Sequence, residues 1–162
     1  MNTMMEVTPL PSRHAVRSLL EDLVGRSVEL RDAGPIPAKA TNVFAVYVNN
    51  KVSTAAVIVV NLELAARLGG ALGMLPKGGV DDAIDERDLY PMMRDCCYEV
   101  LNVLASVFNG VNAQHVRLYE MYGPSGHVPG DVQKFASMPG NRVDIRLSVA
   151  GYGDGLMSVI VR

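Results

Sequence analysis

The longest amphipathic pattern in the chain spans residues 85–109 and predicts a helix. Apolar side chains recur there at intervals of three and four residues, which places them on one broad helix face. This apolar face consists of Leu89, Met93, Cys97, Val100, Leu101, Leu104, Val107 and Phe108. Pro91 lies inside the pattern, so the helix is either kinked in its first turns or begins near Tyr90. The pattern indicates a helix that buries one side against a sheet.

A narrow polar ridge is predicted on the opposite side of this helix. At about 100° per residue, its side chains project within roughly 60° of one another. The residues of the polar ridge are Asp88, Asp95, Glu99, Asn102 and Ser106. Asp, Asn and Ser are poor helix formers, whereas a solvated face usually carries Lys, Arg, Glu or Gln. A requirement other than helix stability therefore favours Asn102 at its position.

Two further helices are predicted before this one. Ser12 is a candidate N-cap for a helix that ends at Gly25. Asn61 is a candidate N-cap for a second helix over residues 61–75. Three glycines in the second helix either weaken it or permit the close approach of another backbone. These are Gly69, Gly70 and Gly73.

The remaining pattern predicts a sheet. Segments that alternate in polarity or are rich in β-branched residues predict strands at 27–31, 43–48, 52–60, 115–122, 142–149 and 156–162. Loops are predicted at 32–39 and 76–82 and from residue 123 onwards, where Gly and Pro are frequent. Helices fall between hairpins rather than between every pair of strands. The order therefore favours an α+β fold, a largely antiparallel sheet with long helices packed on it, over a doubly wound fold.

The chain is predicted to form a single domain over residues 1–162, with residues 1–11 as a loose N-terminal lead. The last predicted strand, 156–162, contains no Pro that would blunt an exposed sheet edge. We therefore expect this strand to be available for pairing with a second copy in a homodimer.

Composition and charge exclude several classes of protein. Apolar residues make up 49% of the chain and charged residues 20%, which is typical of a globular domain. The net charge of −2 argues against a nucleic-acid partner, which would call for a basic patch. The first 14 residues contain no apolar run suited to a signal peptide, and the run at 55–60 is too short to cross a bilayer. A cytoplasmic protein with no membrane partner is expected.

Common catalytic signatures are absent from the sequence: there is no GxSxG, P-loop, HExxH, CxxC or GxGxxG motif after a strand. Three isolated histidines have no ligand spacing, so no metal site is expected. They are His14, His115 and His127. Cys96 and Cys97 are neighbours and form no disulfide framework, and a small apolar core role is favoured for Cys97 over a reactive pair.

The polar ridge carries the most informative spacing. Asp95-x-x-x-Glu99-x-x-Asn102, with a distant Pro124, resembles the active-site motif of the CheC/CheX/FliY family of chemotaxis phosphatases. The predicted order of a hairpin, a glycine-containing helix, an acidic loop, the motif helix and terminal strands is also similar to that family. The motif occurs once, as in single-site CheX-like proteins. At two positions where family members often carry Gly, this chain has Leu101 and Ser106.

The resemblance implies an aspartyl-phosphate phosphatase whose substrate is the phosphorylated receiver domain of a response regulator. Glu99 and Asn102 would be the catalytic residues, and Asp95, Ser106 and Pro124 would contribute to binding. A neutral amide such as that of Asn102 can orient a water molecule without titrating. No cofactor of its own is expected, because the receiver would carry the Mg²⁺. Two alternatives remain: a non-catalytic CheX-like binding or scaffold domain, or a ridge that is only solvated surface.

Overall fold

Six strands form one sheet in the computed structural model, which describes residues 7–110 and 113–162. The strands are β1 (Val28–Asp32), β2 (Val43–Val48), β3 (Thr54–Val60), β4 (Arg117–Tyr122), β5 (Arg142–Val149) and β6 (Gly153–Val161). Their order in the sheet is β1-β5-β6-β3-β2-β4, and every neighbouring pair is antiparallel. The α+β fold with an antiparallel sheet is therefore confirmed.

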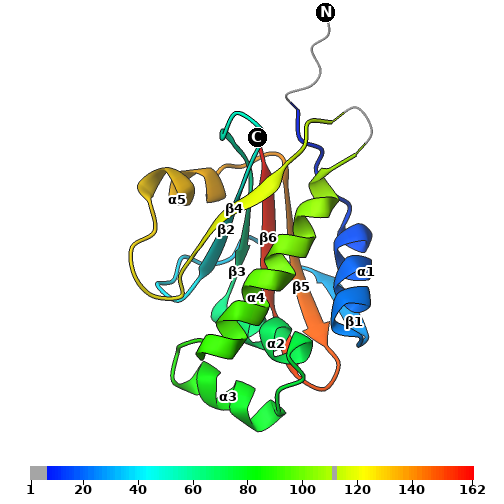
Figure 1. Cartoon of the computed structure of the whole chain (residues 1–162), viewed down its shortest axis with the longest axis vertical. Coiled ribbons are helices and arrows are strands. Elements are labelled where there is room, and N and C mark those ends of the chain that lie inside the picture. The colour runs from blue at the N-terminus through cyan, green and yellow to red at the C-terminus, as the bar shows by residue number, and fades with distance from the viewer. Residues whose placement is uncertain (1–6, 111–112) are drawn as a thin grey trace, which may run out of the picture.

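The helices divide between the two faces of this sheet. They are α1 (Arg13–Val24), α2 (Leu62–Leu72), α3 (Lys77–Asp85), α4 (Pro91–Val103), the 3-10 helix η1 (Leu104–Phe108) and α5 (Gly130–Ala136). Figure 1 shows α1, α2 and α4 together over one face, with α5 well apart from α1. On β3, Ile58 belongs to the large core beneath α1, α2 and α4. Its neighbours Val57 and Val59 pack with Phe135 of α5, because successive strand side chains point to opposite faces.

Both predicted helix N-caps are present. The Ser12 hydroxyl accepts the backbone N–H of Ala15 at 3.0 Å and begins α1. The Asn61 side chain accepts the N–H of Leu64 at 3.0 Å and begins α2. The same Asn61 oxygen also accepts the N–H of Leu156 at 3.0 Å, which ties the start of α2 to β6.

The glycines of α2 permit a close approach of α4, one of the two roles predicted for them. A Cβ atom at Gly69 would lie 2.5 Å from the carbonyl oxygen of Met93 and 3.2 Å from the backbone nitrogen of Cys97. A Cβ at Gly73 would lie 3.1 Å from the sulfur of Cys96. The two helix backbones are therefore in contact at Gly69, where any larger residue would force them apart.

Pro91 begins the central helix rather than kinking it. It occupies the first turn of α4 after the extended Tyr90, where its missing N–H removes no helical hydrogen bond. The alternative of a helix that begins near Tyr90 is therefore confirmed, whereas its predicted continuation as one helix to residue 109 is wrong. Residue 85 ends α3, and the last turns of the pattern are the 3-10 helix η1.

Two short helices lie where the sequence predicted loops. The predicted loop at 76–82 is largely α3, whose Val80 and Ala83 are buried one turn apart. The predicted long loop after residue 123 contains α5, with Val132 and Phe135 buried at the same spacing. Tertiary packing of these pairs outweighs the Gly and Pro residues that suggested loops.

The predicted role of the C-terminal strand is also wrong. β6 lies inside the sheet, with β5 on one side and β3 on the other, so it cannot pair with a second copy. The edge strands are β1 and β4. Of the predicted N-terminal lead, residues 1–6 lie outside the described residues. Residues 7–11 form no helix or strand, but Thr8 is only 4% exposed and is packed rather than loose.

Candidate functional site

The polar ridge lies on the solvent side of α4, as the pattern predicted. Asp95, Glu99 and Asn102 are exposed on α4, and Ser106 is exposed on η1. The opposite face is buried through Met93, Cys97, Val100, Leu101, Leu104 and Phe108. Asp88 does not belong to the ridge, because it precedes α4 and its carboxylate accepts the adjacent N–H of Leu89 at 2.8 Å. From here on, the polar ridge denotes Asp95, Glu99, Asn102 and Ser106.

Three ridge side chains have no hydrogen-bond or ion-pair partner among the described residues. Across residues 7–110 and 113–162, the side chains of Asp95, Glu99 and Asn102 make no hydrogen bond or ion pair. Their polar groups are therefore available to a partner without breaking an internal contact. Since the helix beneath them is fixed by its buried face, they are presented at fixed spacing.

Leu101 presents no bulk at this surface. It is 1% exposed, and its side chain belongs to the core beneath the helix. The difference from the Gly of the family motif is therefore accommodated inside the molecule. Ser106, at the second such position, is exposed but small.

Pro124 lies in the interior instead of on the ridge. It is buried in the loop after β4, together with Gly123. A guanidinium N–H of Arg94 on α4 donates to the carbonyl oxygen of Gly123, which fastens this loop to the first turns of the helix. Pro124 thus helps to shape a loop packed beside α4, and it presents little surface to a partner.

Neither cysteine is an activated nucleophile. Burial raises the pKa of Cys97 to about 12, although nearby Arg94 lowers it in part. The pKa of Cys96 is also raised, first by partial burial and then by the negative charges of Asp95 and Glu99. Both thiols therefore remain protonated near neutral pH, and the core role predicted for Cys97 is confirmed.

Tyr47 is a residue beside the site that the sequence analysis did not single out. Its hydroxyl donates to the carbonyl oxygen of Leu101 at 2.6 Å, one residue before Asn102. Tyr47 is fully buried on β2, so its hydroxyl must find a partner inside the molecule. A tyrosine within an apolar strand signals such a contact, but the sequence does not indicate the partner.

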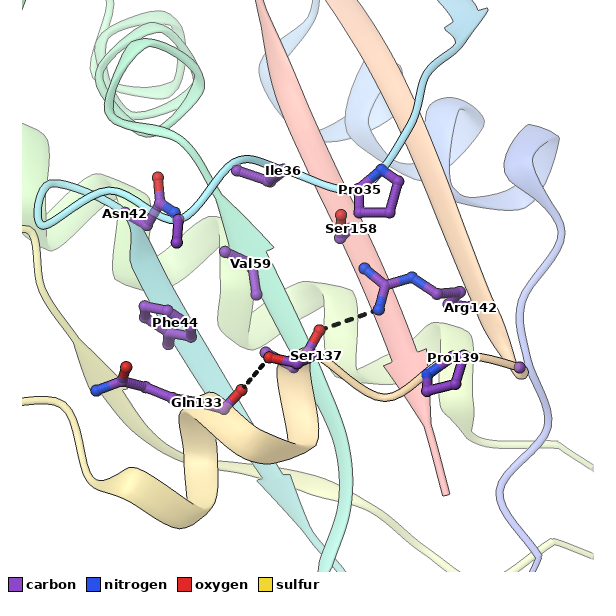
Figure 2. Close-up of a pocket in the computed structure, with 13 residues that line it drawn as sticks. Pro35, Ile36, Asn42, Phe44, Val59, Gln133, Ser137, Pro139, Arg142 and Ser158 are labelled. Carbon is purple, nitrogen blue, oxygen red and sulfur yellow. Dashed lines mark hydrogen bonds between the residues drawn. The ribbon is translucent and has the colours of Figure 1, made fainter.

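A cavity of about 450 Å³ lies on the other face of the sheet, between α5 and the segment before β2. Figure 2 shows its lining, into which Arg142 reaches from β5. Among the described residues, Arg142 is the one charged side chain that lines it, and Asp144 holds it through two hydrogen bonds of 3.0 Å. Arg142 also donates to the carbonyl oxygens of Ala136 at 3.0 Å and Met138 at 2.8 Å. This charge is fully engaged in structure, so the cavity offers less chemistry than the ridge.

Within the described parts of the chain, no three His, Cys, Asp or Glu side chains are grouped closely enough to hold a metal ion. No helix among the same residues is long and apolar enough to span a bilayer. His14, His115 and His127 are exposed and lie in different parts of the chain.

Comparison with known proteins identifies the fold. No protein-family model and no curated sequence matches this chain. The middle domain of FliM from H. pylori matches with a TM-score of 0.58 and 12% identity, over 92% of this chain and 84% of that chain. The CheX–CheY–BeF3–Mg²⁺ complex from Borrelia burgdorferi gives a TM-score of 0.56 and 15% identity, over 91% of this chain and 93% of that chain.

The FliG–FliM complex from H. pylori also matches, with a TM-score of 0.53 and 13% identity, over 92% of this chain and 85% of that chain. At these identities the likeness concerns the fold. The chain therefore has the fold of the CheC/CheX/FliY family, as the spacing on its central helix and the order of its elements predicted.

Proposed function

We propose that this chain is an aspartyl-phosphate phosphatase acting on the phosphorylated receiver domain of a response regulator. The observation that carries the proposal is the exposed pair Glu99 and Asn102, which lie one turn apart on a packed helix and make no hydrogen bond or ion pair with the residues that the structure describes. A carboxylate and a neutral amide at this spacing can dock a partner and position a water molecule at the same time. One chain of the CheX–CheY complex of B. burgdorferi has the same fold, and this complex supports a receiver as the partner.

The chemistry demands little of this chain beyond positioning. An acyl phosphate is already reactive, and its hydrolysis needs a water molecule in line with the bond that breaks. The side-chain oxygen of Asn102 would accept a hydrogen bond from that water and thereby orient a lone pair of the water oxygen toward phosphorus. The amide does not ionise between pH 5 and 9, so its contribution is independent of pH in this range.

Glu99 would fix the docking position. Its carboxylate lies one helical turn before Asn102, where it can pair with a lysine of the receiver at the phosphorylation site. Asp95 and Ser106 extend the contact along the ridge, which spans roughly 16 Å for 11 residues of helical rise. The phosphorylated aspartate and its Mg²⁺ would be supplied by the receiver and belong to the substrate.

A second candidate is a non-catalytic scaffold that binds a signalling partner through the same ridge. The middle domain of FliM, in complex with FliG from H. pylori, has the same fold, and this favours binding without hydrolysis. The two candidates share the docking surface and differ in what Asn102 does once the partner is bound.

The experiment that tests the proposal uses receiver domains from the same organism, phosphorylated with a small phosphodonor. Each receiver is freed of donor and its phosphoaspartate is followed with and without this chain at one-tenth of the receiver concentration. We expect the decay of one receiver to accelerate with multiple turnovers. Stable binding of a receiver whose phosphate decays at its own rate would refute catalysis and favour the scaffold.

A further inference from the structure

Tyr47 on β2 reaches the backbone of α4 immediately beside Asn102. Its hydroxyl donates to the carbonyl oxygen of Leu101 at 2.6 Å, across 54 residues of sequence. Its ring packs on Phe108 of η1, with ring centroids 5.1 Å apart and planes tilted by 57°. Tyr47 is fully buried, which raises the pKa of its phenol well above the usual range. The hydroxyl therefore stays protonated and acts as a donor.

The sheet is irregular at the level of Tyr47 on both sides. On β3, Tyr47 pairs with residue 56 and the next residue pairs with Thr54, so Ala55 is left over. On β4, Tyr47 pairs with Leu118 and the preceding residue pairs with residue 120, so Tyr119 is left over. Each neighbouring strand thus carries one extra residue at this level. Such bulges bend strands and re-aim side chains, and they are frequent near active sites.

The helix is irregular at the matching place. α4 ends at Val103 and continues as the 3-10 helix η1 from Leu104. In an α-helix the carbonyl of residue 101 accepts the N–H of residue 105, whereas 3-10 hydrogen bonds run three residues back and would direct that N–H to residue 102. The carbonyl of Leu101 is therefore open to a side-chain donor, and Tyr47 is that donor.

We infer that Tyr47 is a positioning residue: its hydrogen bond to Leu101 holds the α-to-3-10 transition in place and thereby sets the direction in which Asn102 projects. This inference rests on the proposed function of Asn102. A 3-10 helix advances about 120° per residue and an α-helix about 100°, so moving the transition by one residue rotates the neighbouring side chains by roughly 20°. Such a displacement is enough to misplace a catalytic water.

The test compares two tyrosines with the same kind of contact. Tyr47→Phe removes only the hydroxyl that bonds Leu101. Tyr152→Phe is the matched control, because the Tyr152 hydroxyl donates to the backbone carbonyl of Leu75 at 2.5 Å and Tyr152 is also buried, at 5% exposure. That contact lies in the turn that follows α2, away from Asn102. Both variants keep their rings, and both should show similar, small decreases in the unfolding midpoint.

We expect Tyr47→Phe to reduce the dephosphorylation rate at saturating receiver by about 10-fold to 100-fold, the range expected for a misplacement of about 1 Å, with receiver affinity unchanged. Tyr152→Phe should retain the wild-type rate and affinity. Equal rates in wild type and Tyr47→Phe, or equal losses in both variants, would overturn the inference.

A second readout separates this inference from the proposed function. The side-chain amide resonances of Asn102 should shift in the NMR spectrum of Tyr47→Phe and remain unchanged in Tyr152→Phe. If the wild-type chain fails to accelerate dephosphorylation, the proposed function fails, and this shift still reports whether Tyr47 sets the position of Asn102. Unshifted resonances in Tyr47→Phe would refute the positioning role whatever the activity.

Discussion

Replacing Asn102 with alanine should lower the dephosphorylation rate and slightly raise the free energy of unfolding. If Asn102 aims the attacking water, its loss should lower the dephosphorylation rate at saturating receiver by about 10²–10³-fold, the range found when one preorganised polar group is removed from an active site. Receiver affinity should change little, because Glu99 and the rest of the ridge remain in place.

The effect on stability follows from the surroundings of Asn102. The side chain is exposed, and within the described residues it makes no hydrogen bond or ion pair that its removal could break. Alanine is the best helix former and Asn one of the poorer ones, so Asn102→Ala should raise the free energy of unfolding by about 0.3–0.5 kcal/mol. For a domain of this size, that corresponds to an increase of about 1 °C in the unfolding midpoint.

The assay is phosphoaspartate decay at saturating receiver, with receiver binding and thermal unfolding measured on the same preparations. Asp95→Ala is the control, because Asp95 is also exposed on α4 and also lacks an internal hydrogen bond or ion pair among the described residues. It should be as stable as Asn102→Ala and retain most of the activity. If Asn102→Ala dephosphorylates as fast as wild type, Asn102 is not catalytic. A lowered unfolding midpoint of Asn102→Ala would show that Asn102 does stabilise the fold.

Further outcomes are expected elsewhere on the helix layer. Glu99→Lys should weaken receiver binding by several kcal/mol if the contact is desolvated, as measured by titration calorimetry. Glu99→Gln should lose less binding free energy, because it adds no like charge. Equal receiver affinities of wild type, Glu99→Lys and Glu99→Gln would exclude a charge contact. Gly69→Ala should destabilise the fold by about 1–3 kcal/mol in urea unfolding, because its Cβ would lie 2.5 Å from a backbone oxygen of α4, while Gly34→Ala, with nothing within 4 Å, should not. The free energy of unfolding should fall as pH rises from about 9 to about 12, because the pKa of the Cys97 thiol has its ordinary value of 9.0 in the unfolded chain and burial raises it to about 12 in the folded chain. The free energy of unfolding of Cys97→Ala should fall less over this range. If wild type and Cys97→Ala lose stability in parallel, the pKa of Cys97 is not raised in the folded chain.

The sequence predicted those features that depend on local periodicity. The apolar residues at intervals of three and four predict which face of α4 is buried. They also predict that Glu99 and Asn102 are exposed on the opposite face. The caps at Ser12 and Asn61 were also predictable, because a cap is read within a few residues of the helix it begins. Asn61 does more than its pattern indicates, since the same oxygen also bonds β6.

Features that depend on distant contacts could not be predicted in this way. α3 forms around two glycines because Val80 packs against α2, where a Cβ at Gly70 would lie 2.4 Å from the Val80 side chain. The interior position of β6 depends on which strands it meets, and nothing in its own residues specifies them. The bond from Tyr47 to Leu101 joins a strand and a helix 54 residues apart. Such pairings become visible only when the sheet order is known.

The polar ridge contributes little to the stability of the fold that carries it. The buried side of α4 holds the helix in place through Met93, Cys97 and Leu101, whereas Glu99 and Asn102 contribute no hydrogen bond or ion pair to the described structure. Substitutions at these two positions should therefore change the free energy of unfolding only by the few tenths of a kcal/mol that separate helix propensities. A lineage could gain or lose catalysis here without passing through an unstable intermediate, so an enzyme and an adaptor built on this fold can be separated by one or two exposed side chains.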